Sequence, residues 1–206
     1  MTAPYQELFG DAVDSLHPRL RAHFGEIPRG SVGMGAGVFD VVGTPRRWLW
    51  PVLWVLAVDS IRFPAGHRDV PFTVENTPNV DAWGNASVRA VRTFHFMSGD
   101  RQMIDAITVE GDFLVDHLGQ SRAFIAALSA TVANGELRMT STTFAVRIGR
   151  VHIRIPRTIA PIVTLVERFD DGTGLQYVSV MVDAPMIGRL YENSRSFSYV
   201  LRSEKS

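Results

Sequence analysis

The sequence predicts an α+β protein with a curved or closed, barrel-like antiparallel sheet of about eight to ten strands. N-terminal helices and a tryptophan-rich helix are expected to cover one side of this sheet. Three observations lead to this prediction. Short apolar stretches alternate with hairpin-turn signals from residue 70 onward. Helical apolar spacing is confined to the first 60 residues. Charged residues stand at inward positions of otherwise apolar strands, which indicates a sheet that encloses something.

The size of the chain predicts one domain. It has 206 residues, which is long enough to bury a core. Residues 1–60 form a helical and glycine-rich part, and residues 70–202 form an antiparallel meander. The 21 basic and 21 acidic side chains balance, so nothing indicates a nucleic-acid partner. The sequence leaves the oligomeric state open, with a homodimer as one option.

The sequence has no recognisable targeting signal, which predicts a cytoplasmic location. The longest mostly apolar run, Trp48 to Val58, is well short of the ~20 residues that a membrane span needs. The first residues have neither the basic nor the apolar region of a signal peptide. Cysteine is absent, which fits a reducing compartment and excludes disulfides and thiolate chemistry.

The N-terminal segment predicts helices followed by a glycine-rich strand. The apolar spacing predicts a helix from Tyr5 to Leu16 and a second turn from Pro18 to Phe24, closed by Gly25. The alternating glycines of residues 30–39 fall on one face of a strand. The spacing is not a dinucleotide fingerprint, so we interpret this face as one that allows another element to approach closely.

Residues 44–58 predict a helix that is apolar on nearly every side. Thr44 suits the N-cap and Pro45 the first helical position. Three of the four tryptophans, Trp48, Trp50 and Trp54, fall within seven residues. One interpretation is a helix buried between the sheet and the N-terminal helices. The other is a wall over a site for a hydrophobic ligand, because such sites are lined with aromatic side chains.

The remaining chain predicts successive short strands joined by hairpin turns, which must close or fold over to hide their edges. In one of these strands, apolar and polar residues alternate: Val151, Ile153 and Ile155 lie between Arg150, His152 and Arg154. This alternation predicts an inner apolar face and a solvated His152. The predicted strands are Val70–Val74, Ala86–Met97, Gln102–Val109, Phe113–Leu118, Arg122–Val132, Glu136–Ile148, Val151–Ile155, Ile162–Phe169, Leu175–Val182 and Phe197–Leu201.

Arg92 is the most informative residue of the predicted sheet. It shares a face with Phe94 and Phe96, and Asp116 likewise shares an apolar face with its neighbours on a later strand. An unpaired guanidinium on such a face would cost several kcal/mol. We therefore expect Arg92 to meet Asp116, or another inward acid, inside the sheet.

Strand alternation adds further inward polar residues: Asp105, Glu167 and Tyr177, the last together with Met181. Carboxyl groups that converge in a half-apolar interior have raised pKa values unless a cation compensates, and such groups transfer protons near neutral pH. The alternative is an ion-pair network that only fixes the strand register.

Motifs for metals and cofactors are missing from the sequence. The histidines are scattered singly, so we predict no metal site. No phosphate-binding loop, dinucleotide fingerprint or nucleophile elbow occurs, so we predict no cofactor.

Several short motifs carry a resemblance to a known family. They are Leu16-His17-Pro18 with Arg21 and His23, Gly35–Phe39, Val70–Phe72, Arg92–Phe94, Gly149–Pro156 and Pro185–Tyr191. On these residues the chain resembles the bacterial domain-of-unknown-function family 4166 as a standalone member. The resemblance implies no activity. The chain departs from the family pattern at Ala90, Asp116 and Asn193, and such changes at inward positions would suit a reshaped interior.

The features together favour a cofactor-independent cyclase or isomerase of bacterial natural-product biosynthesis, which acts on a hydrophobic, polyketide-like small molecule. The candidate catalytic residues are Asp105, Asp116 and Tyr191. The candidate ligand-binding residues are Trp48, Trp50, Trp54, Arg92, Phe94, Phe96, Glu167, Tyr177 and Met181. The alternatives are a non-catalytic carrier or sensor of a lipid-like ligand, and an interaction module.

Overall fold

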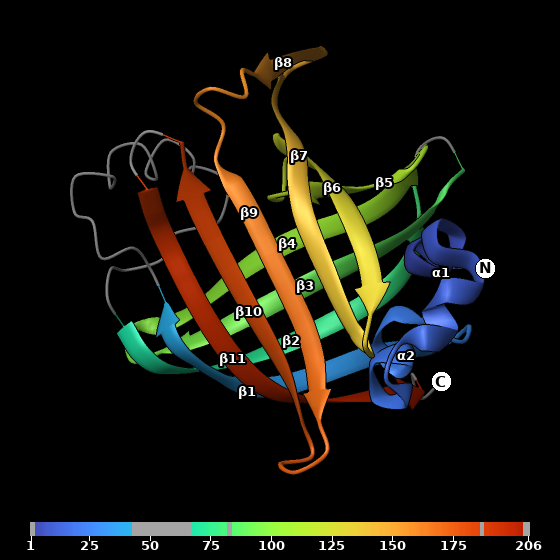
Figure 1. The fold of residues 1–206 in the computed structure, drawn as a ribbon. Coiled ribbons are helices and arrows are strands. Elements are labelled where there is room, and N and C mark those ends of the chain that lie inside the picture. The colour runs from blue at the N-terminus through green and yellow to red at the C-terminus, as the bar shows by residue number, and fades with distance from the viewer. Residues whose placement is uncertain (1–2, 43–66, 82–83, 186–187, 204–206) are drawn as a thin grey trace.

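Ten antiparallel strands close into a barrel in the computed structural model, which describes residues 3–42, 67–81, 84–185 and 188–203 (Figure 1). Strands β1 to β6 pair in sequence order, β6 pairs with β7, and β9, β10 and β11 lead back to β1. An eleventh strand, β8, pairs with β7 outside this ring. The bounds are β1 Ser31–Val42, β2 His67–Val80, β3 Ala86–Phe96, β4 Gly99–Glu110, β5 Phe113–Leu118, β6 Phe124–Ala133, β7 Glu136–Ile148, β8 Val151–Ile155, β9 Ile162–Asp170, β10 Leu175–Ala184 and β11 Gly188–Ser203.

The closed antiparallel sheet confirms the predicted barrel. Strands β5, β7 and β8 begin and end where the sequence predicts. The turn between β6 and β7 has Asn134 and Gly135 at φ 54° and 79°. Positive φ at both central residues matches the twist of a two-residue hairpin, which explains the Asn-Gly pair.

The glycine-rich strand β1 allows the close approach that its sequence indicates. A Cβ atom added to Gly35 would lie 2.7 Å from Val74 Cγ1, and one on Gly37 would lie 2.6 Å from Phe197 Cβ. Side chains of the two neighbouring strands, β2 and β11, therefore occupy the space over these glycines.

Two short helices, joined by a 3₁₀ turn, cover one end of the barrel (Figure 1). The helix predicted from residue 5 to 16 is interrupted: α1 spans Pro4–Phe9, and the 3₁₀ turn η1 spans Gly10–Ser15 because Gly10 takes a positive φ of 50°. Helix α2, Pro18–Phe24, forms as predicted, and the His17 ring caps it by accepting a hydrogen bond from the Arg19 N–H.

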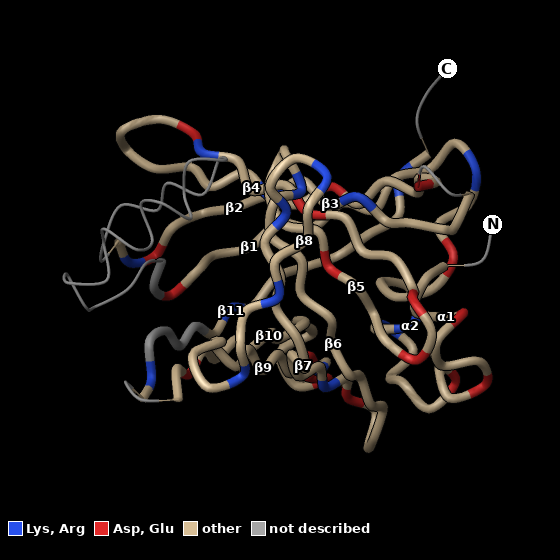
Figure 2. The backbone as a smooth tube through the Cα atoms, turned by 90° about the horizontal axis from the view of Figure 1, so that it is seen from above, with Lys and Arg blue, Asp and Glu red and all other residues tan. Residues whose placement is uncertain are grey.

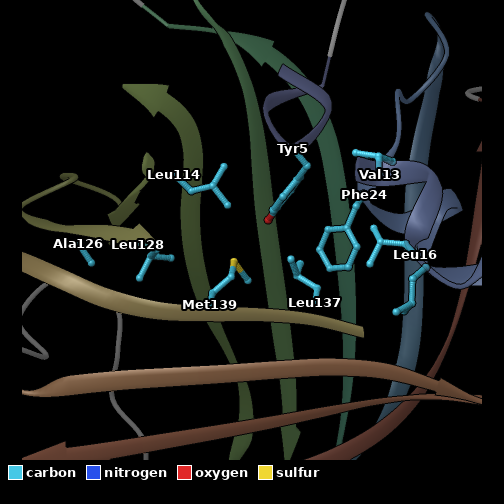
Figure 3. Close-up of a cluster of buried hydrophobic side chains, with 10 residues drawn as sticks. Tyr5, Val13, Leu16, Phe24, Leu114, Ala126, Leu128, Leu137 and Met139 are labelled. Atoms are coloured by element: carbon cyan, nitrogen blue, oxygen red, sulfur yellow. The ribbon is translucent and has the colours of Figure 1, made fainter. Parts of the chain in front are cut away.

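The helices pack their apolar side chains into the barrel and form one end of its core. Leu20 and Phe24 of α2 are 0% and 2% exposed. Figure 3 shows Tyr5 of α1 pointing between the strands of the barrel. The whole cluster consists of Tyr5, Val13, Leu16, Leu20, Phe24, Leu114, Ala126, Leu128, Leu137 and Met139.

A second core cluster is rich in phenylalanine, and it contains Phe94 and Phe96. The Arg195 guanidinium lies over three of its rings, with distances of 4.8, 5.3 and 5.6 Å to the centroids of Phe39, Phe72 and Phe197. A cation over aromatic faces is attracted by the ring quadrupoles. The cluster consists of Phe39, Val70, Phe72, Val74, Ala90, Phe94, Phe96, Val178 and Phe197.

The predicted tryptophan-rich helix, with Trp48, Trp50 and Trp54, lies outside the described residues. Both interpretations of that segment therefore remain predictions. Within the part of the chain that the structure describes, neither helix has the length and apolar character needed to cross a bilayer.

Candidate functional site

The centre of the candidate site is an ion pair on the inner wall of the barrel. Arg92 of β3 and Asp105 of β4 both face inward, and the Arg92 guanidinium donates a hydrogen bond to the Asp105 carboxylate. The Arg92 side chain is 20% exposed and that of Asp105 is 2% exposed. The strand alternation correctly placed both residues inside, and the inward acid that pairs with Arg92 is Asp105.

Asp116 lies close to this pair, because its strand, β5, is the neighbour of β4, which carries Asp105. Its Oδ1 atom is buried and accepts no hydrogen bond within the described structure. Burial raises the pKa of Asp116 well above its usual value, and the charge of Asp105 raises it further. Arg92 opposes both effects. Asp116 therefore holds its proton to a higher pH than an ordinary carboxyl group, which suits a general acid.

Tyr5 brings a phenol from α1 close enough to these charges for them to act on its pKa. Burial raises the pKa of Tyr5 well above its usual value, and the carboxylates of Glu167, Asp116 and Asp105 raise it further. The phenol consequently stays protonated. Sequence reasoning did not single out Tyr5, because it begins a predicted helix and belongs to no motif.

A second polar cluster surrounds His23 of α2, and it includes the predicted Glu167. The His23 Nδ1 atom lies 3.0 Å from a Glu167 carboxylate oxygen and 2.6 Å from the Gln176 amide nitrogen. The Gln176 amide also donates to Glu167. Glu167 and Gln176 are 3% and 2% exposed, so these hydrogen bonds satisfy polar groups that water cannot reach.

Aromatic rings hold the imidazole of His23 from both sides. The ring stacks on Phe24 and on Tyr199, with centroid distances of 4.6 and 4.3 Å. The Asn76 amide lies 3.4 Å from His23 Nε2 and donates to the Tyr199 hydroxyl at 3.3 Å. Burial raises the pKa of Tyr199 to about 12. The arrangement ties α2 to strands β2, β9, β10 and β11.

The inner wall is less buried around Arg92 and Asp116 than at the helix end. Arg92, Asp116 and Leu165 are half-buried, although each lies on a strand that is paired on both sides. By the alternation of their strands, these side chains lie on the inner face of the sheet. Leu118 and Val180 are half-buried inner residues as well. A polar group with a raised pKa thus stands on an inner surface that is mostly apolar.

Tyr177 and Met181 do not join this surface, so the prediction that they face inward is wrong. The inward positions of β10 are Gln176, Val178 and Val180, which belong to or adjoin the barrel core. Tyr177 lies on the outer face, where the Arg168 guanidinium lies 5.0 Å from its ring centroid. Both faces of this strand carry apolar residues, so alternation alone could not select the inner one.

The other predicted site residues divide into two groups. Phe94 and Phe96 face inward and are 3% and 7% exposed, as members of the phenylalanine cluster. Tyr191 lies on β11, but its side chain is outside the described part of the structure, as are the three tryptophans. No three histidines or carboxylates gather in a metal-binding arrangement among the residues described.

Two of the clefts among the described residues are small, and neither is lined by Arg92 or Asp116, although Asp105 contributes to the lining of the larger. The smaller, of about 10 Å³, lies between the N-terminal segment and β2–β3. The larger, of about 100 Å³, is bordered by Arg89, His117 and Arg122 over Ala106. Burial lowers the pKa of His117 at this cleft. The larger cleft lies mainly on the outer face, because His117 has the opposite parity to Asp116.

The raised pKa of Asp116 predicts a specific dependence of stability on pH. The folded state keeps a proton that the unfolded chain releases above a pKa of about 3.9, so the free energy of unfolding falls as the pH rises from there through the folded-state pKa. Asp116→Asn removes this loss. We expect the variant to be more stable than the wild type by about 1–3 kcal/mol at pH 7, and to converge with it at low pH.

Urea denaturation between acidic and neutral pH measures this effect. Asp112→Asn is the matched control, because Asp112 is an exposed carboxyl in the turn that precedes the same strand. Parallel stability curves for the wild type and Asp116→Asn would show that Asp116 has no abnormal titration.

Comparison with known protein families matches residues 16–197 to the family described as "Domain of unknown function (DUF4166)". No curated protein matches the chain. The matched segment includes α2, strands β1 to β10 and the greater part of β11, and it contains Arg92, Asp105, Asp116, His23 and Glu167.

Proposed function

The chain belongs to the DUF4166 family, and we propose that it is a cofactor-independent cyclase or isomerase. Its substrate would be a hydrophobic small molecule of the polyketide type, held against the inner wall of the barrel. The absence of cysteine from the sequence agrees with a cytoplasmic location.

The observation that carries this proposal is the state of Asp116. Its carboxyl group has a raised pKa and a buried oxygen without a hydrogen-bond partner among the described residues. A protonated carboxyl group of this kind can donate its proton to a substrate carbonyl, and the resulting carboxylate can remove a proton from carbon. The net result is an isomerisation or a ring closure without a change in mass.

Arg92 and Asp105 support this role without taking part in proton transfer. A hydrogen bond joins the two residues, and the Asp105 carboxylate is close enough to Asp116 to act on it electrostatically. The repulsion raises the pKa of Asp116, while Arg92 would stabilise the carboxylate that forms when the proton leaves. The apolar wall would hold a flexible substrate in a reactive conformation and exclude water.

The runner-up is a carrier or sensor of a lipid-like ligand. The same ion pair favours it, because a paired Arg92 and Asp105 need no role beyond holding β3 against β4. In this case the inner wall binds the ligand and Asp116 is an internal polar group without chemistry.

Binding and turnover separate these two functions. The first assay measures the fluorescence of a polyene fatty acid, a probe that emits strongly in apolar surroundings. Leu118→Arg puts a charge on the inner wall and should weaken binding of the probe more than tenfold, since it costs several kcal/mol of desolvation. Val38→Arg is the control, because Val38 is 42% exposed and has the opposite parity to the buried Phe39 on β1.

The second assay incubates the protein with linear polyketide-type substrates and detects products of unchanged mass by chromatography. Asp116→Asn should lower turnover by about 10²–10⁴-fold and leave probe binding intact. Binding without turnover in the wild type would support the carrier. Equal binding by the wild type and Leu118→Arg would refute both functions.

A further inference from the structure

A β-hairpin projects from the barrel beside its ring of strands. The early part of β7 pairs with β9 through residues 137–140, whereas its last residues, 144–148, pair with β8. Strand β8 has β7 as its neighbour in the sheet and ends the order of strands (Figure 1). Residues 144–146 still pair with β6 of the barrel. We call residues 147–159, which include β8 and the start of the loop to β9, the projecting hairpin.

One face of the projecting hairpin is apolar and exposed. Ile148 pairs with Val151, and Val146 pairs with Ile153, so their side chains share a face. Ile148, Val151 and Ile153 are 63%, 61% and 51% exposed. Ile159 in the loop that follows is 64% exposed. The predicted inner position of Val151 and Ile153 is therefore wrong, because the hairpin extends beyond the core that would cover them.

The other face and the tip of the hairpin are basic. Arg147 pairs with His152, and Arg154 shares their face. Arg150 occupies the tip and Arg157 the loop after β8. The chain as a whole is neutral, yet between Glu136 and Glu167 it has five arginines and no acidic residue. Figure 2 shows basic segments along the tube at β8, in the view from that end of the molecule.

We propose that the projecting hairpin docks on a membrane surface that contains anionic lipid. Ile148, Val151 and Ile153 enter the boundary between headgroups and acyl chains, and the arginines bind lipid phosphates. An apolar face with arginines on the opposite face and at the tip is the pattern of interfacial segments, because the long arginine side chains extend to the headgroups. The arginines also attract the hairpin to an anionic surface before it inserts.

The combination of the two faces selects this partner over others. A nucleic acid would use the arginines but would leave the isoleucines in water. A second copy of the chain, paired through the same apolar face, would cover the isoleucines but would leave the arginines of the other face in water. The proposal does not depend on catalysis inside the barrel, because no residue of the hairpin belongs to the candidate site.

Vesicle flotation tests the proposal with the whole protein. We expect binding to vesicles of phosphatidylcholine with about 30% phosphatidylserine, weak binding to pure phosphatidylcholine, and release by about 0.5 M salt. Arg150→Glu with Arg154→Glu should weaken binding at least about 20-fold. Val151→Ser with Ile153→Ser should weaken it about tenfold. Arg147 is left unchanged because it donates to the Ser121 carbonyl and holds the hairpin to the barrel.

Matched controls change exposed residues on other elements. Arg29→Glu with Arg101→Glu controls for charge, and Val80→Ser controls for the loss of an exposed apolar side chain. Both should bind vesicles within twofold of the wild type. Hydrogen exchange on the unmodified protein gives a second measurement, in which anionic vesicles should slow exchange in residues 147–157.

Three results would overturn the proposal. The first is equal binding to anionic and neutral vesicles, or no binding to either. The second is a dimer in solution that protects residues 147–157 without lipid, which would assign the face to a second copy. The third is protection by a single-stranded RNA that the serine substitutions leave unchanged, which would assign the arginines to nucleic acid.

Discussion

Arg92→Leu is expected to lower the free energy of unfolding by about 3–5 kcal/mol, the cost of removing one partner of a buried ion pair. The carboxylate of Asp105 is 2% exposed, so it would remain in the barrel without its cation. Asp116 would lose the same compensating charge. Urea denaturation at neutral pH measures the effect, with circular dichroism to confirm that the variant folds.

Two further variants show whether the loss comes from the unpaired charge. The double variant Arg92→Leu with Asp105→Leu should regain most of the lost stability, since apolar pairs often replace buried ion pairs without cost. Arg189→Leu is the surface control: Arg189 pairs with Asp183 at 2.8 Å, but the two side chains are 45% and 41% exposed. It should cost less than about 1 kcal/mol. Equal losses for Arg92→Leu and Arg189→Leu would contradict the assignment.

Leu20→Ala is expected to lower the free energy of unfolding by about 2–5 kcal/mol, the range for a buried leucine that leaves a cavity. Leu20 is 0% exposed and lies on the face of α2 that enters the barrel. The expected loss is large for a helix of seven residues, because such a helix is held by its packing and not by its own propensity.

Arg19→Ala on the same helix is the control for Leu20→Ala. Arg19 is exposed, so its replacement should change the free energy of unfolding by less than about 0.5 kcal/mol. Thermal unfolding of both variants gives the comparison. If Leu20→Ala were as stable as Arg19→Ala, the N-terminal helices would be an appendage and not one end of the core.

The inward charges could be predicted where one face of a strand is much more apolar than the other. On β3, Ala90, Phe94 and Phe96 determine the face of Arg92, and β4 and β5 place Asp105 and Asp116 in the same way. Because side chains alternate between the two faces of a strand, the inward face of these charged residues is then determined. Which acid would pair with Arg92 depends on the register between strands, and alternation within one strand carries no such information.

Prediction from the sequence was incomplete or wrong where the two faces of a strand differ little in apolar character. Strand β11 extends from Gly188 to Ser203, yet only Phe197–Leu201 was predicted. Its first half includes Glu192, Asn193 and Ser194, whose β propensity is low, and it forms because β1 and β10 pair with it on both sides. The inner face of β10 was predicted wrongly because both of its faces are apolar.

The cluster around His23 was also missed, although part of it left a signal. His23 stands between Leu20 and Phe24, the two most buried residues of α2, so it follows the helix face that enters the barrel. Asn76 continues the inward alternation of Phe72 and Val74. His23 meets Asn76 and Gln176 across 53 and 153 positions of the sequence. Only the closed fold brings such distant segments together.

The seam between β1 and β11 has a consequence for synthesis on the ribosome. Ser31 pairs with Ser203, so the first strand of the barrel meets the last one. Until residues 188–203 leave the exit tunnel, the nascent chain has two unpaired strand edges, on β1 and on β10. Such edges readily pair with other chains. Arrival of β11 pairs with both edges in one step, and we expect the nascent protein to be most prone to aggregation before that step.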